Sequence, residues 1–166
     1  MSTLFATSTP RSLRFATTSS GGEAYLIEDW RMPRSSVDLA FDVMVQGSGY
    51  AQIGGLTLGP SYYELLFQVT GGTISFNEWN SANGSTTHSL GATAAGWHRV
   101  TLHADLAVAG GKSPLRVGLD GVTRFQGMTA VSLPALGSVQ AIVGLLYVDS
   151  APKVVFADNV TIDSKP

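Results

Sequence analysis

The sequence predicts an all-β protein, a two-sheet antiparallel jelly-roll sandwich of about twelve strands. The first observation is alternation, because every second residue of Ser36–Gln46 is a bulky hydrophobe, which gives that strand one buried face. The second is composition. The 19 glycines, with frequent Val, Thr and Ser, are typical of β-branched strands joined by tight turns. The third is the lack of any stretch with helical periodicity.

In the first half of the chain, strands are predicted where alternation is bounded by Gly or Pro. Gly21-Gly22 turns the chain between the first two strands, and Pro33 ends the second. Gly54-Gly55 indicates a bulge within a strand, and Gly71-Gly72 a two-residue hairpin. The strands predicted here are Ser12–Ala16, Glu23–Trp30, Ser36–Gln46, Tyr50–Leu58, Tyr62–Thr70 and Thr73–Asn80.

The second half continues in the same way. Asn80–Ser85 is a polar turn, and Asp120-Gly121 is the strongest hairpin signal in the chain. The strands predicted here are Thr86–Leu90, Trp97–Val108, Leu115–Leu119, Val122–Gln126, Val139–Val148 and Val154–Asp163. We expect the last strand to pair with the first, which brings the ends of the domain together.

Length and charge bound the organisation and the partners. The chain has 166 residues and a mass of 17.4 kDa, which fits a single domain. We expect a flexible N-terminal segment over residues 1–10 and a single β-sandwich domain over residues 11–166. The chain has no cysteine, which removes disulfides and thiolate metal sites. A net charge of −2 argues against nucleic acid as a partner. No apolar run predicts a membrane span, and no signal peptide is visible.

Three motifs follow one another at characteristic spacings: Gly96–Leu102 (GWHRVTL), Leu115–Val122 (LRVGLDGV) and Phe156–Ile162 (FADNVTI). In this order they resemble the concanavalin A-like lectin and glucanase superfamily, specifically its laminin-G-like jelly-roll branch, over residues 11–163. The resemblance implies two antiparallel sheets, one of them curved, with a concave face that often binds glycans.

The same resemblance implies a calcium ion. Asp158 matches the position from which such domains often donate a carboxylate. Because calcium takes six to eight oxygen ligands, carbonyls of the turn at 20–22 and the Glu23 carboxylate would complete the set. The alternative is that Asp158 brackets a strand end through hydrogen bonds.

Glycan recognition combines aromatic rings, which stack on sugar faces, with amides, carboxylates and Arg. Trp79, flanked by Asn77 and Asn80, is the leading stacking platform, although a tryptophan there could equally pack under a loop. The candidate ligand-binding residues lie on faces opposite the predicted core and are Trp79, Tyr62, Glu64, Asn77, Arg99 and His103.

The sequence gives less support for a catalytic site than for a glycan-binding site. A retaining glycosidase needs two carboxyl groups about 5 Å apart, whereas Asp38 and Asp42 on one strand face are about 13 Å apart at strand rise. Glu64 and Glu78 could approach across neighbouring strands, but each has the pattern of an isolated surface acid. A lyase would use the outward-facing grouping of Arg99 and His103, whose simpler interpretation is a polar, solvent-facing strand.

The sequence therefore predicts a non-catalytic binding or adhesion module, extracellular or on a cell surface, that recognises a polysaccharide or glycan on its concave sheet. The alternative is a structural or protein-interaction sandwich that forms oligomers. A mean hydropathy of +0.17 and the apolar side chains Met44 and Leu66 on the non-core faces fit this alternative. A polysaccharide lyase or glycoside hydrolase is the third interpretation, so the prediction leaves enzymatic activity open.

Overall fold

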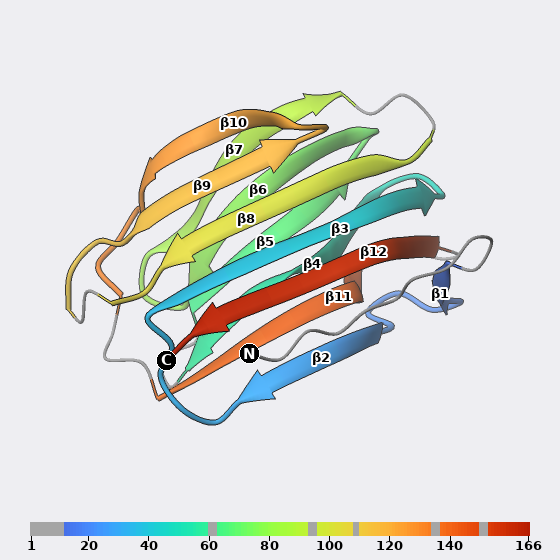
Figure 1. The fold of residues 1–166 in the computed structure, drawn as a ribbon. Helices are drawn as coiled ribbons and strands as arrows, with labels where there is room; N and C mark the ends of the chain where they lie inside the picture. Colours follow the sequence, from blue (N-terminus) through green and yellow to red (C-terminus); the bar gives the residue numbers. More distant parts are fainter. Residues whose placement is uncertain (1–11, 60–62, 93–95, 108–109, 134–136, 150–152) are drawn as a thin grey trace.

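The chain forms two six-stranded antiparallel sheets that pack face to face (Figure 1). A computed structural model describes residues 12–59, 63–92, 96–107, 110–133, 137–149 and 153–166. Sheet A has the strand order β1-β12-β3-β8-β9-β10, and sheet B has the order β2-β11-β4-β5-β6-β7. These residues contain no helix, and so none that could cross a membrane. The all-β sandwich prediction is confirmed, while the expected flexible segment at 1–10 lies outside the described residues.

The strands occur in the predicted order, and their first and last residues differ from the predicted ones by at most a few positions. The predicted Thr86–Leu90 strand is longer in the structure, and the predicted Trp97–Val108 strand is shorter, because it begins one residue later and ends three residues earlier. In sheet A the strands are β1 (Leu13–Thr17), β12 (Lys153–Lys165), β3 (Ser36–Gln46), β8 (His98–Asp105), β9 (Pro114–Leu119) and β10 (Val122–Met128). In sheet B they are β2 (Ala24–Trp30), β11 (Ser138–Val148), β4 (Tyr50–Gly59), β5 (Tyr63–Thr70), β6 (Thr73–Asn80) and β7 (Gly84–Ala92).

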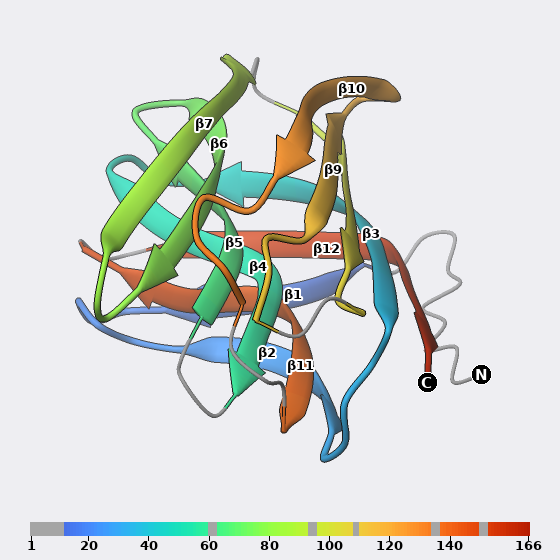
Figure 2. The same cartoon turned by 90° about the vertical axis from the view of Figure 1, so that its left-hand side faces the viewer.

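Two hairpins form where the sequence predicts them. Gly71 and Gly72 join β5 to β6 with φ angles of 56° and 78°, and Asp120 and Gly121 join β9 to β10 with 52° and 77°. Two consecutive positive φ angles give a turn whose twist matches the flanking strands, so these residues fix the register of both hairpins. As expected, β12 pairs with β1. Figure 2 shows the two layers from the side, with β7 and β10 as neighbouring edges of opposite sheets.

The inward-facing residues of both sheets form one core. In β3 the alternating side chains Val37, Leu39, Phe41 and Val43 are all buried, as predicted. The Phe41 ring meets the Phe67 ring of the opposite sheet edge-on, with centroids 5.9 Å apart. Burial of these two facing rows holds the sheets together and leaves the outer faces available for function.

The predicted bulge lies in β4. Gln52 is opposite Gln68 while Gly54 is opposite Phe67, so Ile53 is an extra residue in this strand. A side chain on Gly54 would lie 2.9 Å from the Phe41 ring, which explains why glycine occupies this inward position. Beyond the bulge, alternation resumes with Thr57 on the outer face.

A buried polar network corrects one prediction. Glu78, expected as a surface acid, is only 2% exposed and points between the sheets. Its Oε2 accepts hydrogen bonds from the Tyr63 hydroxyl at 2.6 Å and the Ala130 backbone N–H at 2.7 Å, and its Oε1 lies 2.9 Å from His88 Nε2. The His88 ring in turn lies 3.9 Å from the Phe125 ring of β10. The Glu78 carboxylate therefore links sheet B to Ala130, which follows β10, the edge strand of sheet A.

Candidate functional site

A hollow of about 760 Å³ lies on the outer face of sheet B. Side chains at alternate positions of neighbouring strands line it, because a strand presents every second residue to one face. The lining residues are Glu23, Tyr25, Tyr50, Gln52, Thr57, Glu64, Gln68, Asn77, Trp79, Ser85, Thr87, Gln140, Ile142, Leu146 and Tyr147. We refer to this set as the hollow.

One row of directly opposed residues crosses the hollow through five strands. Gln140 of β11 is opposite Thr57 of β4, and Thr57 is opposite Glu64 of β5. Glu64 is opposite Trp79 of β6, and Trp79 is opposite Ser85 of β7. Opposed side chains have Cβ atoms about 5 Å apart, so the row places a carboxylate beside an indole ring, with an amide and hydroxyls on either side.

The next row forms the floor of the hollow. It runs from Ile142 through Gly55 and Leu66 to Asn77 and Thr87. Leu66, expected to be an exposed apolar residue, is only 1% exposed, which corrects that prediction. The Thr87 hydroxyl donates a hydrogen bond of 2.9 Å to Asn77 Oδ1 and so fixes the orientation of the amide. Of this row, Ile142, Asn77 and Thr87 line the hollow, so its surface is apolar toward β11 and polar toward β6 and β7.

Tyrosines gather at the other end of the hollow. The rings of Tyr50 and Tyr147 are 6.0 Å apart at an angle of 58°, and the Tyr50 hydroxyl donates a hydrogen bond of 3.0 Å to Gln68 Oε1. Burial is the main reason why the pKa of Tyr50 is raised, and the charges of Glu64 and Asp149 raise it further. The hydroxyl is therefore a neutral donor, and Trp79 and this pair provide aromatic surface at opposite ends.

The charge of the hollow is negative. Glu64 and Glu23 contribute carboxylates, and the described lining contains no Lys, Arg or His. Glu64 is half-buried and accepts no hydrogen bond from the described residues, and burial raises the pKa of its carboxyl group. A ligand in the hollow therefore meets a carboxylate whose hydrogen-bonding capacity is unused.

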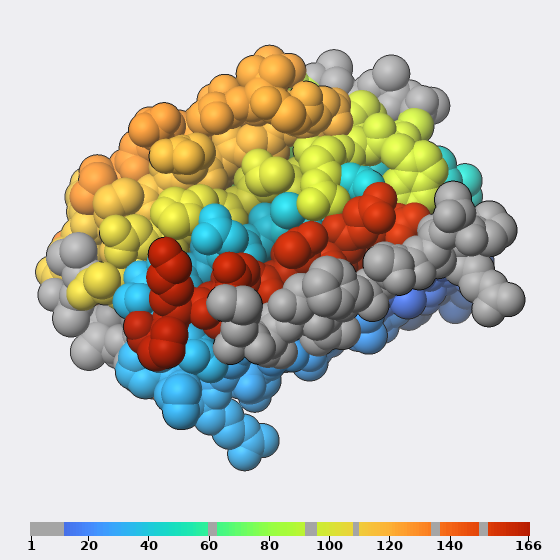
Figure 3. Space-filling model, in the orientation of Figure 1, coloured from blue at the N-terminus to red at the C-terminus, as the bar shows by residue number. Residues whose placement is uncertain are grey.

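The structure brings together three of the six predicted ligand-binding residues. Trp79, Glu64 and Asn77 all line the hollow, whereas Tyr62 lies outside the described residues. Arg99 and His103 project from β8 on the outer face of sheet A, which faces the viewer in Figure 3. They therefore cannot act together with the other three.

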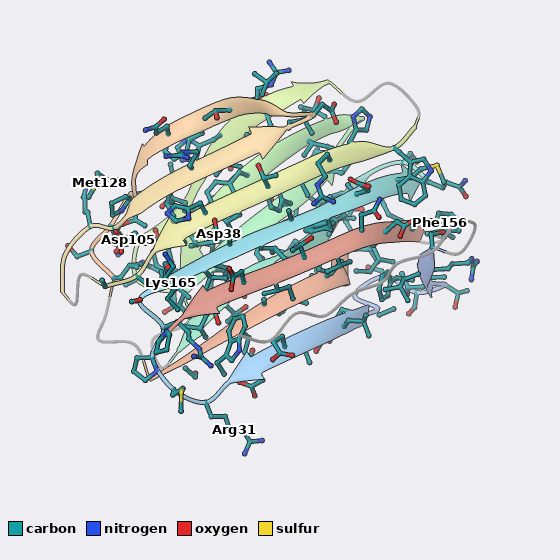
Figure 4. All side chains as sticks on the ribbon, in the orientation of Figure 1. Arg31, Asp38, Asp105, Met128, Phe156 and Lys165 are labelled. Carbon is teal, nitrogen blue, oxygen red and sulfur yellow. The ribbon has the colours of Figure 1, made fainter. Side chains whose placement is uncertain are left out.

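Both residues on sheet A pair with acids of the neighbouring strand. Arg99 Nη1 lies 3.1 Å from Asp42 Oδ1, and His103 Nδ1 lies 2.7 Å from Asp38 Oδ1. Asp38 is labelled on β3 in Figure 4. These pairs correspond to the simpler interpretation of Arg99 and His103 as a polar outer strand face.

The predicted calcium ligands are not brought together either. Asp158 lies on β12, opposite Asp42 on the outer face of sheet A, and its Oδ1 accepts a hydrogen bond from the Asn159 backbone N–H. Glu23 instead lines the hollow of sheet B. Within the described part of the chain, no three acidic or histidine side chains are placed to hold a metal. Asp158 lies within β12, where the pairing with β3 shifts, and not at a strand end, so the structure does not show the alternative role either; calcium binding stays a prediction.

Several lining residues do not follow from simple alternation. Tyr147 has the same parity as Val143 and Leu145, which face the core, yet it lies in the hollow. The reason is a second irregularity, because the pairing of β11 with β4 shifts between Val143 and Tyr147. By contrast, Gln140 does follow the alternation and could have been found from the pattern.

The fold, but no sequence match, connects this chain to known proteins. No family model and no curated protein matches the sequence. The alginate lyase AlyC3 superposes with a TM-score of 0.69 at 9% identity, covering 93% of this chain and 75% of the lyase chain. The family 7 alginate lyase AlgAT5 gives 0.64 at 11% identity, covering 93% and 79%.

A third similar structure is that of botulinum neurotoxin type C, whose cell entry depends on interaction with two ganglioside molecules. Its TM-score is 0.61 at 10% identity over 99% of this chain, which spans only 42% of the toxin chain. At such identities a likeness shows the fold alone. The chain therefore has a two-sheet jelly-roll sandwich, the fold that the resemblance of its sequence motifs implied.

Proposed function

We propose that this chain is a non-catalytic module, extracellular or on a cell surface, that binds a glycan in the hollow of sheet B. The observation that carries the proposal is the row that places Glu64 directly beside Trp79. An indole ring can stack on the apolar face of a pyranose, while the adjacent carboxylate and amides bind its hydroxyl groups. The similar structures include alginate lyases and a neurotoxin whose cell entry depends on ganglioside molecules, which agrees with a carbohydrate ligand.

The chemistry of the lining favours binding over catalysis. A lyase that acts on uronates needs a cation to neutralise the sugar carboxylate, and the described lining contains none. A glycosidase needs two carboxyl groups within about 10 Å. Glu64 on β5 and Glu23 next to β2 are separated by β11 and β4, which corresponds to about 14 Å of strand spacing. Glu78 points to the opposite face of sheet B and cannot serve as the partner of Glu64.

Affinity electrophoresis in gels that contain different polysaccharides tests the proposal. We expect at least one neutral or cationic polysaccharide to retard the protein, and Trp79→Ala to weaken binding about tenfold, the equivalent of one lost stacking contact. Trp97→Ala is the matched control, because Trp97 is 46% exposed but lies outside the hollow. Loss of retardation in both variants, or no retardation of the wild-type protein in any gel, would contradict the proposal.

A second candidate function is a structural or protein-interaction sandwich that forms oligomers. One observation favours it: Tyr25, Leu26 and Ile27 are consecutive, each more than 40% exposed, on the edge strand β2. An apolar strand at a free sheet edge can pair with another chain. Sedimentation velocity would then show a discrete oligomer that Ile27→Lys dissociates, whereas a monomer at all concentrations would exclude this function.

A further inference from the structure

The Glu64 carboxylate has an unusual environment for a surface acid. It is half-buried in the centre of the row that crosses the hollow, and no described residue donates a hydrogen bond to it. Burial of an ionised group without partners is unfavourable, so the folded protein keeps this carboxylate at a cost in stability. A ligand that supplies a donor or a positive charge would recover that cost.

The groups around Glu64 reinforce its negative field. Among the lining residues, Glu23, Tyr25, Tyr50 and Tyr147 are the other titratable side chains, and none of them carries a positive charge. On the same strands, Glu78 and His88 point to the opposite face of sheet B, where they contact each other. Lys153 Nζ lies 4.0 Å from Asp149 Oδ1 beyond the tyrosine end, but this lysine is buried and hydrogen-bonds to the Ser48 carbonyl. No described cation of the hollow therefore neutralises Glu64.

The ring opposite Glu64 adds a second attraction for cations. Trp79 is the direct cross-strand partner of Glu64, and indole is the aromatic side chain that attracts cations best through its π face. A carboxylate next to an indole ring is a combination that suits an ammonium group held on an otherwise apolar sugar face.

Resting on the proposed function, we propose that the hollow selects glycans that carry free amino groups, such as glucosamine polymers, because the Glu64 carboxylate and the Trp79 ring form a cation-binding pair at its centre. An N-acetylated sugar keeps a hydrogen-bond donor at the same position but brings no charge. A uronate brings a second negative charge close to Glu64, which opposes binding. The order of affinity is therefore amino sugar first, N-acetylated or neutral sugar next, and uronate last.

Isothermal titration at one near-neutral pH tests this order with four oligosaccharides of equal length: glucosamine, N-acetylglucosamine, glucose and alginate oligomers. We expect the glucosamine oligomer to bind the wild-type protein about tenfold more tightly than its N-acetylated form. Glu64→Gln should reduce this ratio to near one while binding of the N-acetylated oligomer persists. Trp79→Ala should weaken the binding of both.

Asp163→Asn is the control for general attraction between a polycation and a protein with a net charge of −2. Asp163 is exposed on the outer face of sheet A, opposite Asp38, so its removal changes the charge equally without touching the hollow. The preference for amino sugars must survive in this variant. If it disappears as in Glu64→Gln, or if Glu64→Gln keeps it, the inference is wrong.

The outcomes also separate the inference from the proposed function. If neutral and amino oligomers bind equally and Trp79→Ala weakens both, the hollow binds glycans but not through charge, and only the inference fails. If no oligosaccharide of any class binds the wild-type protein, both fail together.

Discussion

Removal of the buried Glu78 carboxylate should destabilise the sandwich strongly. Glu78→Ala leaves two donors without an acceptor, the buried Tyr63 hydroxyl and the partly buried Ala130 N–H. The third partner, His88, is partly exposed and can turn to water. At about 1 to 3 kcal/mol for each unsatisfied buried donor, the loss is about 4 kcal/mol. For a chain of this length, that corresponds to a fall in Tm of about 8 to 16 °C.

A conservative variant separates the loss of hydrogen bonds from the loss of volume. In Glu78→Gln, the amide oxygen can take over both bonds now made by Oε2, and the amide N–H₂ can donate to the His88 ring. We therefore expect a cost of about 1 kcal/mol, or about 3 °C in Tm. Urea unfolding followed by circular dichroism measures both variants, and equal m-values would show that only the native state has changed.

The result that would refute this reasoning is a Glu78→Ala variant that unfolds within about 2 °C of the wild-type protein. Such a result would mean that the network contributes little beyond what water could supply. An equal, large loss in Glu78→Gln and Glu78→Ala would instead show that the charge itself, rather than the acceptor geometry, stabilises the link between the sheets.

Three further variants test the hollow and one turn. Gly55→Ala should lower the free energy of unfolding in urea by more than about 2 kcal/mol. The φ of Gly55 is 148°, and a Cβ at this position would lie 2.1 Å from the Leu65 carbonyl oxygen. An unchanged urea midpoint would contradict this prediction. Glu64→Gln should raise Tm at neutral pH, because the raised pKa of Glu64 in the folded protein means that its ionised form is unfavourable there. The gain in Tm should vanish as the pH falls below 4.5, the ordinary pKa of a glutamate, because wild-type Glu64 is then protonated in both the folded and the unfolded state. A gain in Tm that persists in acid would show that it does not come from the ionised Glu64 carboxylate. Asp120 has a lowered pKa, mainly through its hydrogen bond with His98, so its contribution is present above the ordinary value of 3.8 and is lost as pH falls through the lowered folded value. Asp120→Asn should therefore lower stability by less than about 1 kcal/mol near neutral pH and match the wild-type protein in strong acid, as thermal scans at a series of pH values would show.

The strands and hairpins followed from the sequence because their causes are local. Alternation of hydrophobes fixes which face of β3 is buried, and the turn at Asp120-Gly121 needs residues that accept positive φ. The same parity argument placed Trp79, Glu64 and Asn77 on an outer face. For these residues, a side chain's face depends only on its neighbours along the strand.

The rest of the site depends on information that is not local. Parity cannot tell which of two sheets a strand joins, so Arg99 and His103 were grouped with residues on the opposite side of the molecule. Tyr147 changed faces because of an irregularity in β11 that no glycine pair or proline marked as clearly as Gly54-Gly55 marks β4. Glu78 could be buried only because three partners from distant positions reach it.

An NMR titration of the ¹⁵N-labelled protein with a glucosamine oligomer shows directly whether the glycan binds in the hollow, because every backbone amide reports on its own surroundings. We expect the largest shift changes on β4, β5, β6 and β11, around Glu64 and Trp79, while the amides of sheet A stay unchanged. Shift changes centred on β3, β8 and β12 would place the ligand on the other side of the sandwich and contradict binding in the hollow.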